Sequence, residues 1–265
     1  MHLTVSHTTR YSYDQPVDYA LQQVRLTPQN TTQQEIISWD LSVEGGQIET
    51  SYRDHLGSVV HLVSSARDTR AIAITAGGEV MTTDTAGVYG KGQGAAPLWY
   101  FNRETPLTRA GEQIKALAKI LEGTKDPLNT LHALSDAILE AAPYKTGRTY
   151  AETPAEAALV GGSGVCQDHA QIFIAAARAA GMPARYVSGY LMMNDRISQD
   201  ASHAWAEVHL EGLGWIGFDV SNGISPDARY IRIAVGLDYK DAAPLSGLRR
   251  GDAKEQMVVS LQVQQ

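Results

Sequence analysis

The chain has 265 residues, of which 43% are hydrophobic and 19% charged, with 24 glycines and 10 prolines. This composition is typical of a globular protein with a substantial core, and it excludes wholesale disorder and collagen-like structure. The net charge of -7 disfavours binding to nucleic acid or to anionic membranes. Because Cys166 is the single cysteine, an intramolecular disulfide and a zinc site made of thiolates alone are also excluded.

The beginning of the chain has no basic flank followed by an apolar core, so it does not resemble a signal peptide. No stretch reaches the ~18 to 20 uninterrupted apolar residues that a membrane-spanning helix requires. We therefore expect a cytoplasmic protein with no membrane partner.

Residues 1–85 are rich in threonine, valine, isoleucine, serine and tyrosine, and they alternate between polar and apolar side chains in short runs. This pattern predicts an N-terminal antiparallel β-sandwich-like module. The expected strands are 3–13, 19–26, 36–43 and 59–63, and the expected turns are Gly45-Gly46, Asp54 with Gly57, and Gly77-Gly78. Residues 86–97 are glycine-rich and have no apolar period, which predicts a linker.

Residues 98–265 are expected to form an α+β core with C-terminal strands. Two helices are predicted before the cysteine, one with Ile114, Leu117, Ala118 and Leu121 on a single face and one after Asp126-Pro127. A third, buried helix covers the alanine-rich segment 170–180 and ends at Gly181. The expected strands are 184–192, 203–210, 215–220, 230–235 and 257–263.

Cys166 follows the glycine-rich segment 161–165 and precedes the alanine-rich helix, which places it at a helix N-terminus. Free backbone N–H groups and the helix dipole stabilise a thiolate there, and a neighbouring imidazolium lowers the thiol pKa further below ~8.5. A cysteine nucleophile requires such an environment. The alternative is that Cys166 is a small buried residue of the core.

The alternation of side chains between the two faces of two predicted strands indicates a partner for the cysteine. His203 lies on the face of strand 203–210 that is opposite to its alanines, Val208 and Leu210. Asp219 lies on the equivalent face of strand 215–220, and the turn 211–214 joins the two strands. An antiparallel hairpin therefore brings the imidazole and the carboxylate together. Cysteine, histidine and aspartate in this arrangement can act as nucleophile, base and orienting acid.

Four segments carry a resemblance to a known family: Gly164-Val-Cys-Gln-Asp-His-Ala170, 181–189, 202–208 and 214–219. They resemble the transglutaminase-like superfamily in its bacterial branch, whose members are often described as cysteine proteases. Residues 23–28 are similar to the N-terminal region that accompanies this core. The resemblance implies a papain-like, transglutaminase-like core in which Cys166 is the nucleophile, His203 the base and Asp219 the orienting acid.

The sequence offers two candidates for one donor of the oxyanion hole. The Cys166 N–H is one donor, but animal transglutaminases add an upstream tryptophan, and no tryptophan lies between Trp99 and Trp205. Tyr144 and Gln167 are the candidates for the second donor. Trp205 is expected either to line the cleft or to pack against the helix.

Two further alternatives concern residues near the cysteine. A zinc site formed by Cys166, His169, His203 and Asp219 is conceivable because zinc accepts sulfur, nitrogen and oxygen donors, but it would sequester the thiolate. We therefore expect neither a metal nor another cofactor. Glu207 is expected to bind a cationic substrate group or to pair with Arg185.

The preferred hypothesis is acyl chemistry on a peptide or glutamine-type amide through a thioester, with hydrolysis as the outcome. Protein cross-linking by an acceptor lysine is the close alternative, since it shares the acyl-enzyme step. A non-catalytic peptide-binding module is the alternative from another class. In each case the expected partner is a peptide or protein, and no nucleic acid.

Overall fold

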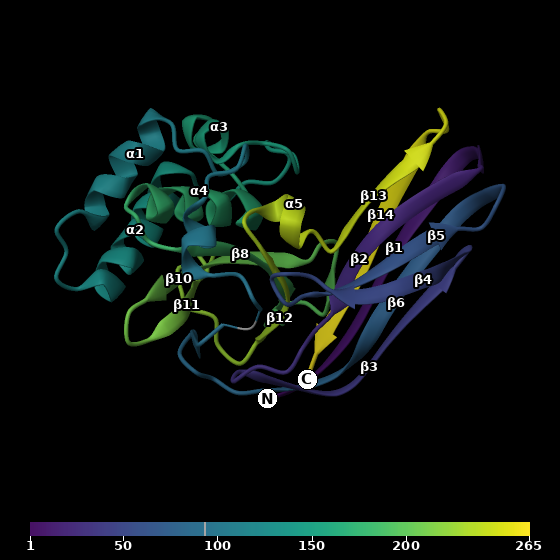
Figure 1. Ribbon diagram of the computed structural model, residues 1–265, viewed down its shortest axis with the longest axis horizontal. Coiled ribbons are helices and arrows are strands. Elements are labelled where there is room, and N and C mark those ends of the chain that lie inside the picture. Colours follow the sequence, from purple (N-terminus) through teal and green to yellow (C-terminus); the bar gives the residue numbers. More distant parts are fainter. Residues whose placement is uncertain (93) are drawn as a thin grey trace.

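In the computed structural model, which describes residues 1–92 and 94–265, two antiparallel sheets form one end of the molecule (Figure 1). The strands of this part are β1 (His2–Val17), β2 (Tyr19–Thr27), β3 (Gln34–Glu44), β4 (Gly46–Arg53), β5 (Val59–Ser65), β6 (Thr69–Thr82), β9 (Ser198–Gln199), β13 (Leu245–Arg250) and β14 (Glu255–Gln264). The first sheet has the order β3-β6-β1-β14-β9, and the second has the order β13-β2-β5-β4.

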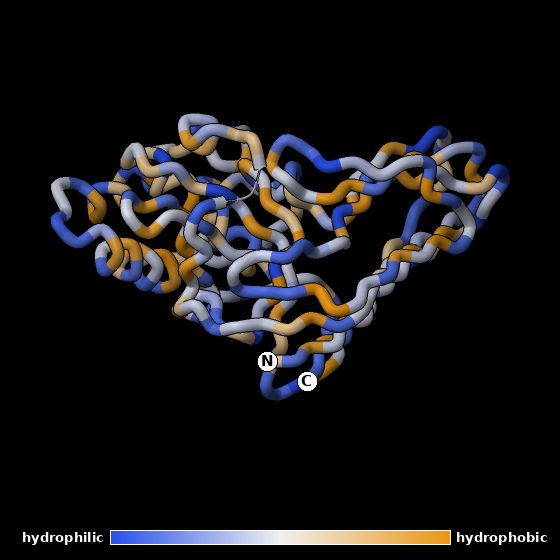
Figure 2. Tube along the Cα trace, turned by 60° about the horizontal axis from the view of Figure 1, so that its bottom comes forward, coloured by the Kyte–Doolittle hydropathy of each residue, from blue (hydrophilic) through white to orange (hydrophobic). Residues whose placement is uncertain are grey.

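The two sheets form a sandwich because alternate side chains of their strands share one hydrophobic cluster. Tyr11 of β1, Val24 of β2, Val63 of β5 and Ile72 of β6 are all buried in it. The alternation of hydrophilic and hydrophobic residues along these strands is visible in Figure 2. The predicted N-terminal antiparallel β module is thus confirmed, with strands close to all four predicted runs.

The expected turn at Gly77-Gly78 is wrong, because both residues lie inside β6 and pair with β1 on one side and β3 on the other. A Cβ atom at Gly78 would lie 2.1 Å from the Ser38 carbonyl oxygen, at an irregularity of β3. The glycines therefore allow close approach of neighbouring strands rather than a change of direction.

The remainder of the chain folds into an antiparallel sheet with helices on one face (Figure 1). Its strands are β7 (Val88–Gly90), β8 (Ala184–Leu191), β10 (His203–Leu210), β11 (Gly214–Phe218) and β12 (Tyr230–Gly236), in the order β12-β8-β10-β11-β7. The helices are α1 (Glu112–Ala118), α2 (Pro127–Ala141), α3 (Ala155–Val160), α4 (Cys166–Ala179) and α5 (Tyr239–Ala242), with short 3-10 helices η1 (Leu98–Asn102) and η2 (Lys119–Leu121). The α+β fold class is confirmed.

Helix α4 is the centre of this core. Its small and apolar side chains are almost entirely buried, and it packs on β10 and β8 on one side and on α1, α2 and α3 on the other. Phe173 of α4 stacks on Phe218 of β11 at 5.0 Å between ring centroids. The sheet face below α4 carries the apolar side chains of β10, so the polar side chains of β10 lie on the opposite face.

Three expectations about the organisation of the chain are corrected. Among the described residues before the cysteine there are three α-helices rather than two, because the short helix α3 has too few residues to show a period. The segment 86–97 is not a free linker: β7 within it pairs with β11 as the edge of the core sheet, while residue 93 lies outside the described residues. Strands β13 and β14 pair with β2 and β1, so they belong to the sandwich rather than to the core.

The sandwich and the core are packed directly against each other. Leu3 and Val5 of β1 belong to the same hydrophobic cluster as α4 and the core sheet. The side chain of His7 contacts the Tyr190 hydroxyl of β8 at 2.8 Å. The side chain of Gln34 on β3 exchanges two hydrogen bonds with the backbone of Arg232 on β12, at 2.7 and 2.8 Å. Within the described residues, no helix has both the length and the apolar character needed to cross a membrane.

Candidate active site

Cys166 is the first residue of α4, as the sequence predicts, and its side chain is partly exposed. The partial exposure argues against the alternative that Cys166 only fills the core. The thiol lies at the positive end of a helix that is 14 residues long, beside backbone N–H groups that have no partner within the helix. This position favours a negatively charged sulfur.

The turn into α4 is held by Asp168, which is buried. Its Oδ2 atom accepts hydrogen bonds from the Val165 N–H at 2.8 Å and from the Thr149 hydroxyl at 2.6 Å. Gly164 must lack a side chain, because a Cβ atom there would lie 2.7 Å from the Cβ of Asp168. Asp168 thus fixes the backbone immediately before Cys166, a role that the sequence analysis missed.

His203 and Asp219 are in direct contact, as strand parity predicts. The His203 Nε2–H donates to Asp219 Oδ2 at 2.6 Å. The pairing of β10 with β11, in which Ala206 faces Phe218, places the two residues on the same face of the hairpin. The Cys166 thiol also interacts with the His203 side chain and favours its charged form. Since Nε2 is engaged by Asp219, Nδ1 is the nitrogen available to the sulfur.

The Asp219 carboxylate is itself oriented by two residues that the sequence analysis missed. The Tyr230 hydroxyl and the Asn222 side-chain amide both donate to its Oδ2 atom at 2.7 Å, and the Asn222 N–H donates to Oδ1 at 3.3 Å. Asn222 follows Asp219 by one turn, and such a local Asx-type pattern is a signal that the sequence does contain. Tyr230 comes from β12, and no local spacing connects it with Asp219.

The electrostatics of this group favour a charged imidazole. Burial opposes the charge on His203, but the attraction of Asp219 and Cys166 and the hydrogen bonds to both raise its pKa from 6.5 to about 10. Burial likewise opposes the charge on Asp219, but the contact with His203 and the bonds from Asn222 and Tyr230 lower its pKa below 3.8. The charges of the imidazolium and the carboxylate therefore stabilise each other, and both side chains are almost entirely buried.

Of the two candidates for a second oxyanion donor, Tyr144 lies close to the cysteine. Its backbone forms a bridge with Gly164, and its pKa is raised by burial and by the charges of Cys166 and Asp219. Gln167 is placed differently, because its side-chain Nε2–H donates to the Ala151 carbonyl at 3.0 Å. The phenol of Tyr144 is consequently the better placed of the two.

Trp205 does not line an open cleft. Its side chain is 1% exposed, stacks beside His203 at 6.3 Å and meets Tyr230 edge to face at 5.5 Å. It also lies on the sheet face opposite to α4, so it does not pack against the helix either. Both predictions for Trp205 are therefore wrong. Its indole ring instead packs against the imidazole of His203.

His169 is not directed toward Cys166. Its Nε2–H donates to the Ala142 carbonyl at 2.7 Å, and its Nδ1 accepts from the Ser221 hydroxyl at 2.8 Å. Burial lowers its pKa, so this imidazole is neutral and both nitrogens are occupied. Over residues 1–92 and 94–265, no three histidine, cysteine, aspartate or glutamate side chains are arranged to hold a metal ion.

Glu207 pairs with Arg185, which was one of its two expected roles. Arg185 Nη2 lies 2.6 Å from Glu207 Oε2, and both side chains are buried. A second guanidinium, that of Arg232, lies 3.0 Å from the same carboxylate. Glu207 is therefore paired inside the protein and is not accessible to a cationic substrate group.

Comparison with known proteins matches both parts of the chain. Residues 115–220 match the model of the transglutaminase-like superfamily, and residues 3–81 match that of the bacterial transglutaminase-like N-terminal region. An uncharacterized protein of Mycobacterium bovis is 30% identical, covering 92% of this chain and 86% of its own length. Another from Mycobacterium leprae is 26% identical and covers 98% of both chains.

A crystal structure shows the same fold. The protein, from Cytophaga hutchinsonii, is described as a candidate cysteine protease and superimposes with a TM-score of 0.76. The match covers 100% of this chain and 98% of that chain at 21% sequence identity.

Proposed function

The chain belongs to the transglutaminase-like superfamily, with the bacterial transglutaminase-like N-terminal region, and from this premise we propose that it is a cysteine-dependent hydrolase of peptide or glutamine-type amides. The observation that carries the proposal is that one imidazole, His203, donates to the Asp219 carboxylate and has its pKa raised by both Asp219 and the Cys166 thiol. Nucleophile, base and orienting acid are the three parts that acyl transfer from an amide requires.

In the first step, His203 holds the proton of the Cys166 thiol and the sulfur attacks the carbonyl carbon of the amide. A carbon–sulfur bond forms and the carbonyl oxygen becomes an oxyanion. The Cys166 N–H and the Tyr144 hydroxyl are the proposed donors to this oxygen. When the carbon–nitrogen bond breaks, His203 delivers its proton to the departing amine or ammonia, and a thioester remains.

In the second step, water resolves the thioester. His203 removes a proton from the water, the hydroxyl oxygen attacks the thioester carbon, and the carbon–sulfur bond breaks. The thiolate then regains its place beside the imidazolium. Asp219 remains ionised throughout, since it orients the imidazole through Nε2 and stabilises its positive charge. A primary amine in the place of water would give cross-linking by the same route.

Other residues of the site support this chemistry by fixing positions. Asp168 fixes the backbone next to Cys166 by accepting a hydrogen bond from the Val165 N–H. Asn222 and Tyr230 orient the Asp219 carboxylate by donating hydrogen bonds to it. Trp205 shields one side of the imidazole from water. These contacts restrict the base to a single orientation, which lowers the cost of reaching the transition state.

A time course of amide cleavage tests the proposal. Peptide amides and glutamine-containing peptides are incubated with the protein, with and without a primary amine, and the products are followed by mass spectrometry. We expect free acid as the main product even with the amine present, and no product with Cys166→Ala. Amine-linked product in excess would favour cross-linking instead. No product from either class of substrate would favour a non-catalytic peptide-binding module.

A further inference from the structure

A second site lies where the sandwich meets the core sheet. It is a pocket of about 350 Å³, which falls within the range of small-molecule sites. We call it the junction pocket. Its lining residues are Asn30, Thr31 and Thr32 from the segment between β2 and β3, Tyr89, Lys91 and Gly92 from the segment at β7, Arg185 from β8 and Arg232 from β12. Cys166 and His203 do not line it, so it is separate from the candidate active site.

The junction pocket is strongly cationic. Arg185, Arg232 and Lys91 line it, and none of the described residues in its lining is acidic. The two guanidiniums share the carboxylate of Glu207, which is 0% exposed. One carboxylate against three cations leaves an excess of two positive charges. One of these two charges belongs to the largely buried guanidinium pair and the other to the exposed Lys91. A buried charge without a counter-charge is costly, so the uncompensated guanidinium favours an anion in the pocket.

The two guanidiniums are held in fixed positions before any ligand arrives. Arg185 is 1% exposed and lies over the Trp215 ring at 3.8 Å. Burial lowers its pKa to about 10 against the opposing effect of Glu207, so it remains charged at neutral pH. Arg232 lies over the Tyr89 ring at 5.6 Å, and Gln34 binds its backbone on both sides. Preorganised donors bind an anion without a further loss of side-chain entropy.

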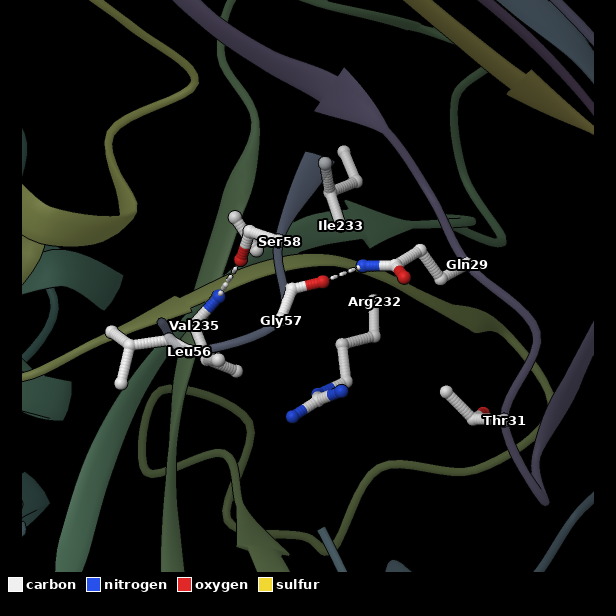
Figure 3. Close-up of a pocket in the computed structure, with 9 residues that line it drawn as sticks. Gln29, Thr31, Leu56, Gly57, Ser58, Arg232, Ile233 and Val235 are labelled. Carbon is white, nitrogen blue, oxygen red and sulfur yellow. Dashed lines mark hydrogen bonds between the residues drawn. The ribbon is translucent and has the colours of Figure 1, made fainter. Parts of the chain in front are cut away.

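A neighbouring cavity, drawn in Figure 3, shares Thr31 and Arg232 with the junction pocket. Its volume is only about 10 Å³, which is no more than one water molecule requires. A hydrogen bond from the Gln29 side chain to the Gly57 carbonyl closes it (Figure 3). A ligand that reaches Arg232 therefore occupies the junction pocket and not this cavity.

We propose that the junction pocket binds a small molecule through a phosphate group. A phosphate carries a charge of about -1.5 to -2 at neutral pH, which matches the excess of two positive charges, whereas a single carboxylate does not. Its oxygens accept hydrogen bonds from the guanidinium N–H groups that do not face Glu207 and from the Lys91 ammonium group. Thr31 and Thr32 come from the sandwich and the arginines from the core, so the bound phosphate joins the two parts of the molecule.

Thermal unfolding and calorimetry with pyrophosphate and with inorganic phosphate test this site, with acetate as the carboxylate probe. We expect a saturable rise in Tm with both phosphates and none with acetate at the same ionic strength. The affinity should fall when the salt concentration is raised. No saturable rise with either phosphate, or an equal rise with acetate, would overturn the proposal.

Matched variants locate the binding. Arg232→Gln should weaken pyrophosphate binding by about tenfold or more, because it removes a charged hydrogen-bond donor. Lys91→Ala should weaken it by about threefold to fivefold, since Lys91 is exposed. Lys119→Ala, which removes the same charge from an exposed position in η2, should leave it unchanged. Equal affinities for the Lys91→Ala and Lys119→Ala proteins would place binding elsewhere.

The proposal is independent of the proposed enzymatic function. Cys166→Ala removes the proposed nucleophile and leaves the junction pocket intact, so this variant should bind pyrophosphate as the unaltered chain does. Loss of binding in Cys166→Ala would show that the anion occupies the cysteine site and would contradict a separate pocket.

Discussion

Two buried charged clusters stand on the same face of strand β10. One contains His203, which contacts Asp219 and the Cys166 thiol. The other contains Glu207, which pairs with Arg185 and Arg232. The first cluster can transfer a proton because an imidazole and a thiol belong to it. The second cannot, because its guanidiniums stay protonated, so it can only attract and hold charge.

Positions 203 and 207 of β10 serve different purposes because their partners differ. In the cluster around His203, the sulfur of Cys166 is partly exposed, so a substrate can reach the group that gives up its proton. In the cluster around Glu207, two guanidiniums share one carboxylate, which leaves one spare positive charge beside the junction pocket, and Lys91 adds a second. Trp205, which is buried between the two positions along β10, separates them with an apolar ring. Variants in each cluster should consequently affect different properties.

The largest effect is expected from Asp219→Asn. The neutral amide no longer stabilises the imidazolium and presents the wrong hydrogen-bonding group to Nε2, so kcat should fall by about 10³- to 10⁴-fold. Amide cleavage under single-substrate conditions measures this, and circular dichroism checks that the fold is retained. The matched control is Asp227→Asn, in a part-exposed pair with Arg229. A kcat of Asp219→Asn within tenfold of the unaltered chain would contradict the assigned role.

Glu207→Gln should instead lower stability. It leaves two buried guanidiniums without a counter-charge, for which the expected loss is about 3 to 5 kcal/mol in the free energy of unfolding. Urea unfolding measures this loss, with Glu211→Gln in an exposed turn as control. If the junction pocket binds phosphate, pyrophosphate should restore part of the lost stability. An unchanged urea midpoint would mean that the second cluster carries no net stabilisation.

Tyr144→Phe tests the proposed oxyanion donor. Loss of one donor that acts in the transition state should lower kcat by about tenfold to a hundredfold, with KM little changed. The exposed Tyr150, which is 82% exposed, supplies the control Tyr150→Phe. Equal rates for the two phenylalanine variants would exclude Tyr144 as the second donor and leave Gln167 to be tested.

The smallest effect is the pH dependence of stability. The raised pKa of His203 stabilises the fold fully below about pH 6.5, and this contribution is lost as the pH rises toward 10. The lowered pKa of Asp219 stabilises the fold above pH 3.8, and this contribution is lost as the pH falls. The Tm difference between the unaltered chain and Asp219→Asn should therefore be greatest between about pH 4 and 6.5. A difference that grows toward pH 10 would contradict this assignment of charges.

Local patterns predicted the parts of the site that depend on one strand or one helix. The glycine-rich approach placed Cys166 at the start of α4, and strand parity brought His203 to Asp219. Both inferences use a period that the sequence displays directly.

Other features depend on contacts between distant segments, which no local pattern reports. Strands β13 and β14 return to the sandwich because β2 and β1 leave edges to be paired, although these strands lie far apart in the sequence. Tyr230 likewise contacts Asp219 from β12, a strand outside the β10–β11 hairpin. The excess charge of the junction pocket arises from three segments that only the folded chain brings together. The cytoplasmic location stays a prediction.

The central claim is that His203 activates the thiol of Cys166, and the pH dependence of alkylation tests it most directly. Because the chain has 1 cysteine, the rate of modification by iodoacetamide reports on Cys166 alone. The account predicts rapid alkylation that persists to about pH 6, and a rate at that pH at least about tenfold lower in a folded His203→Ala protein. A slow rate that rises only toward alkaline pH, identical in the two proteins, would contradict it.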